Sequence, residues 1–104
     1  MEKVIRDGKV AVLYSPGFGA GWSTWAHDGE GENLLFDPMI VSCVERNDKD
    51  KLETYMAMRY PDVYTGGMED LRIEWLPEGT LFRIHEYDGS ESIEVKEEMD
   101  WVTA

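Results

Sequence analysis

The chain has 104 residues, of which 42% are apolar and 31% are charged, and 22 Asp and Glu against 10 Lys and Arg give a formal charge of −12. A domain of this size can bury one hydrophobic core and has no room for two, so we expect a single domain over residues 1–104. The acidic balance argues against binding of duplex nucleic acid through its phosphates, which needs a basic surface, so we expect no direct nucleic-acid partner. The single cysteine excludes an internal disulfide and a multi-cysteine zinc site.

The distribution of charge and hydropathy along the chain indicates where the negative charge lies and in which compartment the protein is expected. Residues 1–52 hold nine acids and six bases, whereas residues 53–104 hold thirteen acids and four bases, so the negative field belongs to the C-terminal half. No apolar run approaches the length of a membrane span, and the N-terminal residues lack the apolar stretch of a signal peptide. We therefore expect a cytoplasmic protein with no membrane partner.

The N-terminal segment predicts a β-hairpin followed by a long loop. Asp7-Gly8, a dipeptide typical of tight hairpin turns, separates the apolar residues 4–5 from the apolar run 10–14. The second run is rich in β-branched residues and nearly free of polar ones, which indicates a strand buried on both faces. Five glycines and three aromatic residues follow between positions 15 and 33, where we expect an ordered loop.

Two short helices are predicted in the middle of the chain. Asp37-Pro38 is typical of a helix start, because the carboxylate can accept from free amides and proline suits the first helical position. This helix should run to about Arg46. Asn47-Asp48 offers a second cap, and the next helix should end at Tyr60-Pro61, since the residue before a proline avoids the α region.

The C-terminal half alternates apolar and polar residues with the period of β-strands at 71–75, 82–85 and 92–95. The predicted fold class is therefore α+β: an N-terminal β-hairpin, whose second strand joins or packs on a C-terminal three-stranded antiparallel meander, with two short helices packed on one face. The predicted core consists of Val10, Val12, Leu13, Leu35, Ile40, Val44, Leu52, Met56, Leu71, Ile73, Trp75, Phe82 and Ile84.

The glycine-rich loop is the local feature with the clearest capacity to bind a ligand. Successive amides in such a loop can form a concavity for an anion, and neighbouring indoles and hydroxyls can stack on and hold a planar molecule. The loop matches neither the P-loop nor the dinucleotide-binding pattern. The candidate ligand-binding residues are Gly17, Gly19, Gly21, Trp22, Ser23, Thr24 and Trp25, with Arg83 as a cation that could approach from the meander. In the alternative interpretation, Phe18 and the two tryptophans fill the core beneath a tight loop.

The acid excess supports a second hypothesis. Carboxylates that project from a sheet at strand spacing can imitate a nucleic-acid backbone and occupy a basic cleft on another protein. The candidate interaction residues are Glu69, Asp70, Glu74 and Glu94. The alternative is that these charges serve solubility alone.

The inventory of reactive residues does not favour catalysis. Cys43 lies in an apolar helical stretch, where a thiol is typically buried and inert, and no serine has the context of a nucleophile. His27 and His85 are the only imidazoles, too few to hold a metal alone, and the acids at 28, 30 and 32 match only the start of a calcium loop. We expect a protein that is not an enzyme and that uses no cofactor or metal.

Three strings resemble a group of small uncharacterised proteins encoded by bacteriophages and prophages: residues 10–25 (VAVLYSPGFGAGWSTW), 64–67 (YTGG) and 82–92 (FRIHEYDGSES). The resemblance covers most of the chain and implies a phage context and the cytoplasm of a host cell. It transfers no catalytic residue. Small phage proteins of this kind often act by binding, either to sequester a host defence signal or to block a host complex.

Together these observations predict a small acidic binding protein with a counter-defence role. The first hypothesis is that it sequesters a nucleotide-like signal at the loop 15–25 without cleaving it. The alternative is that it is an acidic inhibitor that blocks a basic cleft on a host protein complex. We also expect a homo-oligomer, because large apolar side chains are numerous for this length and the edge strands have no obvious cover.

Overall fold

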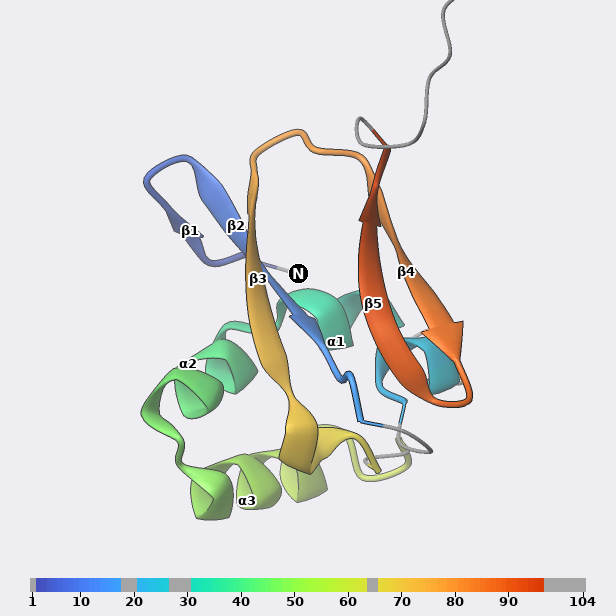
Figure 1. The fold of residues 1–104 in the computed structure, drawn as a ribbon. Helices are drawn as coiled ribbons and strands as arrows, with labels where there is room; N and C mark the ends of the chain where they lie inside the picture. The colour runs from blue at the N-terminus through green and yellow to red at the C-terminus, as the bar shows by residue number, and fades with distance from the viewer. Residues whose placement is uncertain (1, 18–20, 27–30, 64–65, 97–104) are drawn as a thin grey trace, which may run out of the picture.

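The computed structural model describes residues 2–17, 21–26, 31–63 and 66–96 (Figure 1). Its elements are β1 (Ile5–Arg6), β2 (Lys9–Tyr14), the 3-10 turn η1 (Ser23–Trp25), α1 (Gly31–Phe36), α2 (Pro38–Arg46), α3 (Lys49–Arg59), the 3-10 turn η2 (Met68–Asp70), β3 (Arg72–Pro77), β4 (Phe82–Tyr87) and β5 (Ser90–Val95). The α+β class is confirmed, as are the N-terminal hairpin and the antiparallel pairing of the C-terminal strands.

The strand order differs from a continuous C-terminal meander. β1, β2 and β3 form one antiparallel sheet with β2 in the centre, while β4 and β5 form a separate two-stranded sheet. The chain leaves the first sheet just after β3. The amide of Glu78 donates to the Gly8 carbonyl at 2.9 Å, which continues the β2–β3 pairing by one residue, and a turn at Gly79 with φ +83° then leads into β4. β4 pairs with β5 in the second sheet.

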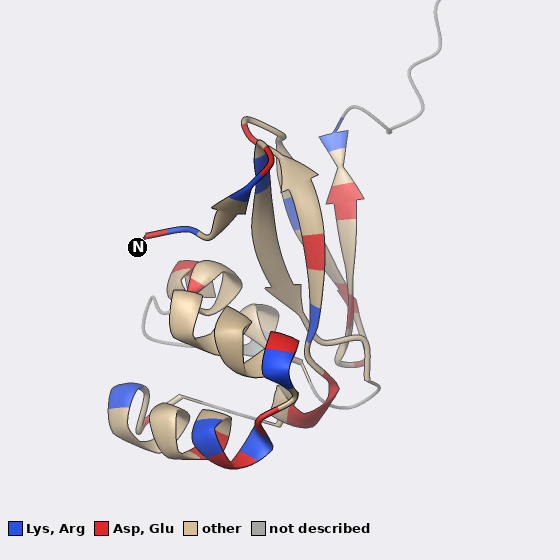
Figure 2. Ribbon diagram, turned by 90° about the vertical axis from the view of Figure 1, so that its left-hand side faces the viewer, with Lys and Arg blue, Asp and Glu red and all other residues tan. Residues whose placement is uncertain are grey.

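The central strand separates two apolar clusters, as its sequence predicts. Ala11 and Leu13 of β2 face the helices together with Ile73 of β3, whereas Val12 faces the β4–β5 hairpin together with Leu76. Alternate residues of a strand point to opposite faces, so one strand can serve both clusters. Figure 2 shows the result, with the helices on one side of the three-stranded sheet and the hairpin on the other.

The helix boundaries follow the capping signals, with one addition. Asp37 caps α2 by accepting from the Met39 amide at 2.9 Å, Asn47 ends α2 in the left-handed region, and Asp48 caps α3. The short helix α1 lies within the segment that we expected to be loop. Its residues Leu34 and Phe36 are buried, Leu34 in the cluster that contains Ala11 and Leu13 and Phe36 in the cluster that contains Val12. None of the helices in the described ranges is long and apolar enough to cross a bilayer.

Asp37 also organises two tyrosines from α3 and its end. Its Oδ2 accepts from the hydroxyls of Tyr55 at 2.7 Å and Tyr60 at 2.6 Å, and the carboxylate is buried. Burial, reinforced by the hydrogen bond to this carboxylate, raises the pKa of Tyr55 to about 12 and raises the pKa of Tyr60 as well. The folded state therefore favours the neutral form of both phenols.

This linkage predicts a loss of stability at alkaline pH. An unfolded tyrosine ionises at pH ~10, so the contribution of both phenols is complete below that pH. Above it the Tyr55 contribution is lost up to about pH 12, and the Tyr60 contribution also falls as the pH rises. We expect denaturant titrations of the wild type to show a falling free energy of unfolding across this window. The double variant Tyr55→Phe/Tyr60→Phe should be less stable at neutral pH and should have a flatter alkaline slope. Equal slopes for the two proteins would contradict this account.

Candidate functional site

The loop after β2 converges on one acidic side chain, Glu91 of β5. Oε1 of Glu91 accepts from the Ser15 amide at 3.0 Å. Oε2 accepts from the Trp22 amide at 2.9 Å, the Thr24 amide at 3.1 Å and the Thr24 hydroxyl at 2.6 Å. The side chain is only 1% exposed. The loop thus presents several donors to one anion, and that anion is a carboxylate of the chain itself.

Backbone hydrogen bonds fasten the same loop to the β4–β5 turn. The Glu91 amide donates to the Ser15 carbonyl at 2.9 Å, and the Gly21 amide donates to the Gly89 carbonyl at 2.7 Å. The Ser90 hydroxyl donates to the Pro16 carbonyl at 2.7 Å. The amides of Gly21 and Trp22, two of the predicted ligand donors, are therefore already used within the fold.

Trp22 does not have the role predicted for a stacking platform. Its side chain is 0% exposed, and its indole Nε1 donates to the Leu34 carbonyl of α1 at 2.9 Å. A base cannot reach either face of a ring packed in this way, so the prediction that Trp22 stacks on a ligand is wrong. The alternative interpretation, that Trp22 fills the core beneath the loop, is confirmed.

The other predicted loop residues are only partly accounted for. Gly19 lies outside the described residues, and Trp25 ends η1 with a side chain that is likewise not described. Ser23 is half-buried at the start of η1. The ligand roles of these three residues stay predictions.

Arg83 and Glu94 are paired with each other. They face each other across the β4–β5 ladder, and Arg83 Nε lies 2.8 Å from Glu94 Oε2. Glu94 is three residues from Glu91 along β5, a separation of roughly 10 Å. Arg83 and Glu94 thus form an exposed ion pair on the β4–β5 hairpin, and their predicted roles in ligand binding and in a protein contact stay predictions.

Close backbone packing explains why this segment is rich in glycine. A methyl group on Gly67 would lie 2.0 Å from the Gly21 carbonyl oxygen, and the Ser15 hydroxyl donates to the Gly67 carbonyl at 2.9 Å. A methyl group on Gly17 would lie 2.3 Å from Oδ2 of Asp70. These two glycines let the loop pack closely against the η2 segment. This packing accounts for them without a bound ligand.

The remaining candidate acids lie in the open on η2 and β3. Glu69 and Asp70 are exposed on η2, beside the loop, and Glu74 is exposed on β3. Residues 61–96 hold nine acids and three bases, whereas residues 37–60, which span α2 and α3, hold five acids and four bases. The acid excess is therefore concentrated outside the two longer helices (Figure 2).

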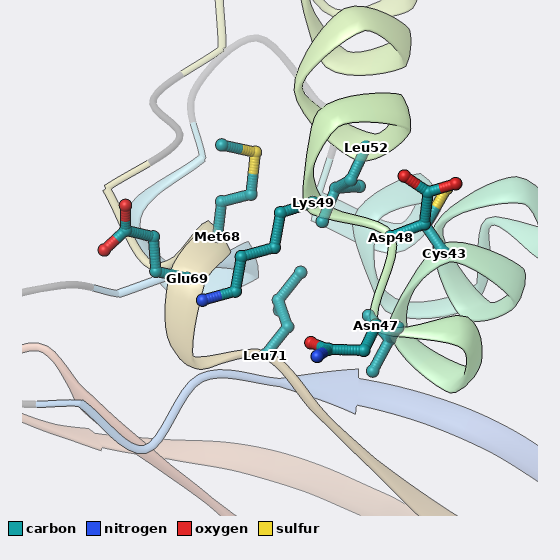
Figure 3. A pocket seen from close by; sticks show the side chains of 9 residues that line it. Cys43, Asn47, Asp48, Lys49, Leu52, Met68, Glu69 and Leu71 are labelled. Carbon is teal, nitrogen blue, oxygen red and sulfur yellow. The ribbon is translucent and has the colours of Figure 1, made fainter.

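A small cavity lies between the α2–α3 connection and η2. In Figure 3 the side chain of Leu71 lies between those of Asn47 and Lys49, and the Lys49 side chain extends toward Glu69 of η2. The cavity volume of about 60 Å³ accommodates a few waters and is too small for a nucleotide. Cys43 lies in its wall, and burial raises the pKa of this thiol above its ordinary value, which disfavours the reactive thiolate.

The described residues contain no group of three or more His, Cys, Asp or Glu placed to hold a metal ion. His85 is exposed on β4 opposite Ser92, whereas His27, Asp28 and Glu30 lie outside the described ranges. Comparisons with protein-family models, curated proteins and solved structures found no match to the chain.

The Glu91 hydrogen bonds should be measurable as stability. Glu91→Ala would leave the amides of Ser15, Trp22 and Thr24 without their acceptor, and we expect it to lower the free energy of unfolding by about 3 kcal/mol or more. The matched control is Glu74→Ala, a strand glutamate that is exposed, with an expected change within about 0.5 kcal/mol. Urea denaturation followed by tryptophan fluorescence measures both. Similar small losses for the two variants would show that Glu91 is not the structural centre of the loop.

The glycine contacts generate a second matched pair. Gly67→Ala should cost about 2 kcal/mol or more, because its methyl group would collide with the backbone of Gly21. Gly17→Ala should cost less than about 1 kcal/mol, since the Asp70 side chain can rotate away. Thermal unfolding of both variants tests the difference. A Gly17→Ala protein as unstable as Gly67→Ala would contradict it.

Proposed function

We propose that this protein is a non-enzymatic acidic binding module whose η2–β3 surface, defined by Glu69, Asp70 and Glu74, docks on a basic surface of another protein. The observation that carries the proposal is the internal use of the loop donors by Glu91. A phosphate would have to compete with a buried carboxylate that already holds four hydrogen bonds. The acids of the η2–β3 surface face solvent and are open to a cationic partner.

The charge distribution supports the same surface. The ion pairs found among the described residues, Arg6–Glu45 and Arg83–Glu94, do not include Glu69, Asp70 or Glu74, although the exposed Arg72 lies between Asp70 and Glu74. An uneven field of this sign accelerates association with a basic protein and orients the encounter. The phage resemblance would make that partner a host protein in the host cytoplasm. A nucleotide-like ligand at the loop is the competing hypothesis.

The proposal predicts that binding to a basic partner depends on where the acidic residues lie as well as on the net charge of the protein. The triple variant Glu69→Lys/Asp70→Lys/Glu74→Lys should bind an oligolysine peptide at least about tenfold more weakly than wild type at low ionic strength. The control, Glu2→Lys/Glu32→Lys/Glu78→Lys, makes the same change in net charge at exposed positions elsewhere and should lose much less affinity. Isothermal titration at two salt concentrations measures both. Equal losses would show that net charge alone governs binding.

The competing hypothesis is tested on the same proteins. A panel of cyclic and ADP-ribose-type nucleotides should leave the tryptophan fluorescence of wild type unchanged if the loop is structural. Saturable quenching with a dissociation constant below about 100 μM that is abolished by Trp25→Ala would favour nucleotide binding at the loop. It would contradict the proposal that the η2–β3 surface is the main binding site.

A further inference from the structure

Strand β3 forms one edge of the three-stranded sheet, since it pairs with β2 on one side and the described residues place no strand on the other. The bond from the Glu78 amide to the Gly8 carbonyl shows which backbone groups face outward. It continues the register of β2 and β3, and in an antiparallel pair every second residue exchanges such bonds with its partner. Glu74 therefore bonds to β2, whereas the backbone groups of Ile73 and Trp75 point away from it.

These outward backbone groups are open to another strand. Among the described residues, no hydrogen bond to the outward amides and carbonyls of Ile73 and Trp75 is found. Leu71, just before β3, is also extended. Pro77 ends the edge, because it has no amide hydrogen and its carbonyl accepts from the Thr80 amide at 3.1 Å. The open edge therefore covers residues 71–75, and an edge of this kind is a template for pairing with another chain.

Two exposed side chains of opposite charge lie on this edge. Arg72 and Glu74 flank Ile73, and alternate residues of a strand project from the same face of the sheet. Neither residue belongs to the ion pairs found within the described ranges. A two-fold rotation centred on Ile73 exchanges these two positions. It brings Arg72 of each copy opposite Glu74 of the other.

We propose that β3 pairs antiparallel with β3 of a second copy of this chain, with Ile73 opposite Ile73. The register fits the backbone, because Ile73 presents outward groups in both copies and Trp75 faces Leu71 of the second copy. It also forms two Arg72–Glu74 pairs, each between residues directly opposite across the strands. Registers centred on Arg72 or on Glu74 would place like charges opposite each other, which opposes pairing.

The alternation of base and acid is also the reason that the partner is a second copy. A two-fold interface needs a patch that is complementary to itself, and this edge meets that need. A purely basic strand would place a cation opposite Arg72. The other edges lack the pattern, because β1 has two residues and Arg83 of β4 is already paired with Glu94 of β5. The remaining charged residues of β4 and β5 are acidic.

The inference does not rest on the proposed function, although the two contacts share Glu74. A copy that is paired through β3 offers a basic partner Glu69 and Asp70 alone, so oligolysine should shift the protein toward the monomer. Sedimentation of the protein alone tests the pairing, whereas the oligolysine titration tests the docking. Each proposal can therefore fail while the other holds.

Exchanging the two charges tests the register. Wild type should sediment with twice the mass of one chain at about 100 μM. Arg72→Glu and Glu74→Arg should each raise the dimer dissociation constant by about tenfold or more, because each brings like charges into contact twice. The double variant Arg72→Glu/Glu74→Arg should return to within about threefold of wild type, since opposite charges face each other again.

An equimolar mixture of the two single variants should form a heterodimer, because one copy supplies two acids and the other supplies two bases. Net charge does not explain this pattern, since Glu74→Arg makes the protein less acidic and should still dissociate it. Both positions are exposed, so thermal unfolding should show that each variant is folded. A wild type that stays monomeric at about 200 μM would overturn the proposal. So would a double variant that associates as weakly as the single ones.

Discussion

The buried carboxylate of Glu91 is the constraint on which the rest of the structure depends. Burying a charge is costly unless donors replace the lost water, and here the donors come from a loop about seventy residues earlier in the chain. The same contacts hold the β4–β5 hairpin to the end of β2 and set the path of the loop. That path places Trp22 in the core, under α1. One acid thus joins the sheet, the hairpin and the largest core side chain.

The parts of the fold that sequence predicts well are those decided by neighbours along the chain. The turn at Asp7-Gly8 has the positive φ values that its composition indicates, and Asp37 and Asp48 cap α2 and α3 where expected. The antiparallel ladder of β3 with β2, from Lys9–Pro77 to Tyr14–Arg72, joins segments about sixty residues apart, and no local pattern indicates that β4 pairs with β5 alone. Strand existence is therefore a local property here, whereas strand order is a tertiary one.

In the candidate site, too, local features are predictable from sequence and contacts between distant segments are not. The sequence identifies the loop as a source of converging donors, and period two along β5 places Glu91 on the same face as the apolar Ile93 and Val95. An acid on the inner face of a strand is the signal that could have identified the acceptor. What the sequence could not supply is the distance between the two segments. Glycine content misled in a similar way, since Gly67 and Gly21 permit a close backbone approach.

The identity of that acceptor also limits what the loop can bind. A phosphate at the same donors would have to displace the Glu91 carboxylate or share the site with it. Two anions within hydrogen-bond distance in a site of low dielectric repel each other by several kcal/mol or more, by an estimate of roughly 4 kcal/mol at 4 Å even with strong screening. Glu86, opposite Glu91 in the β4–β5 ladder, adds a third acid. A carboxylate at these donors therefore opposes an anionic ligand there, whereas the docking on a cationic partner that we propose avoids this repulsion.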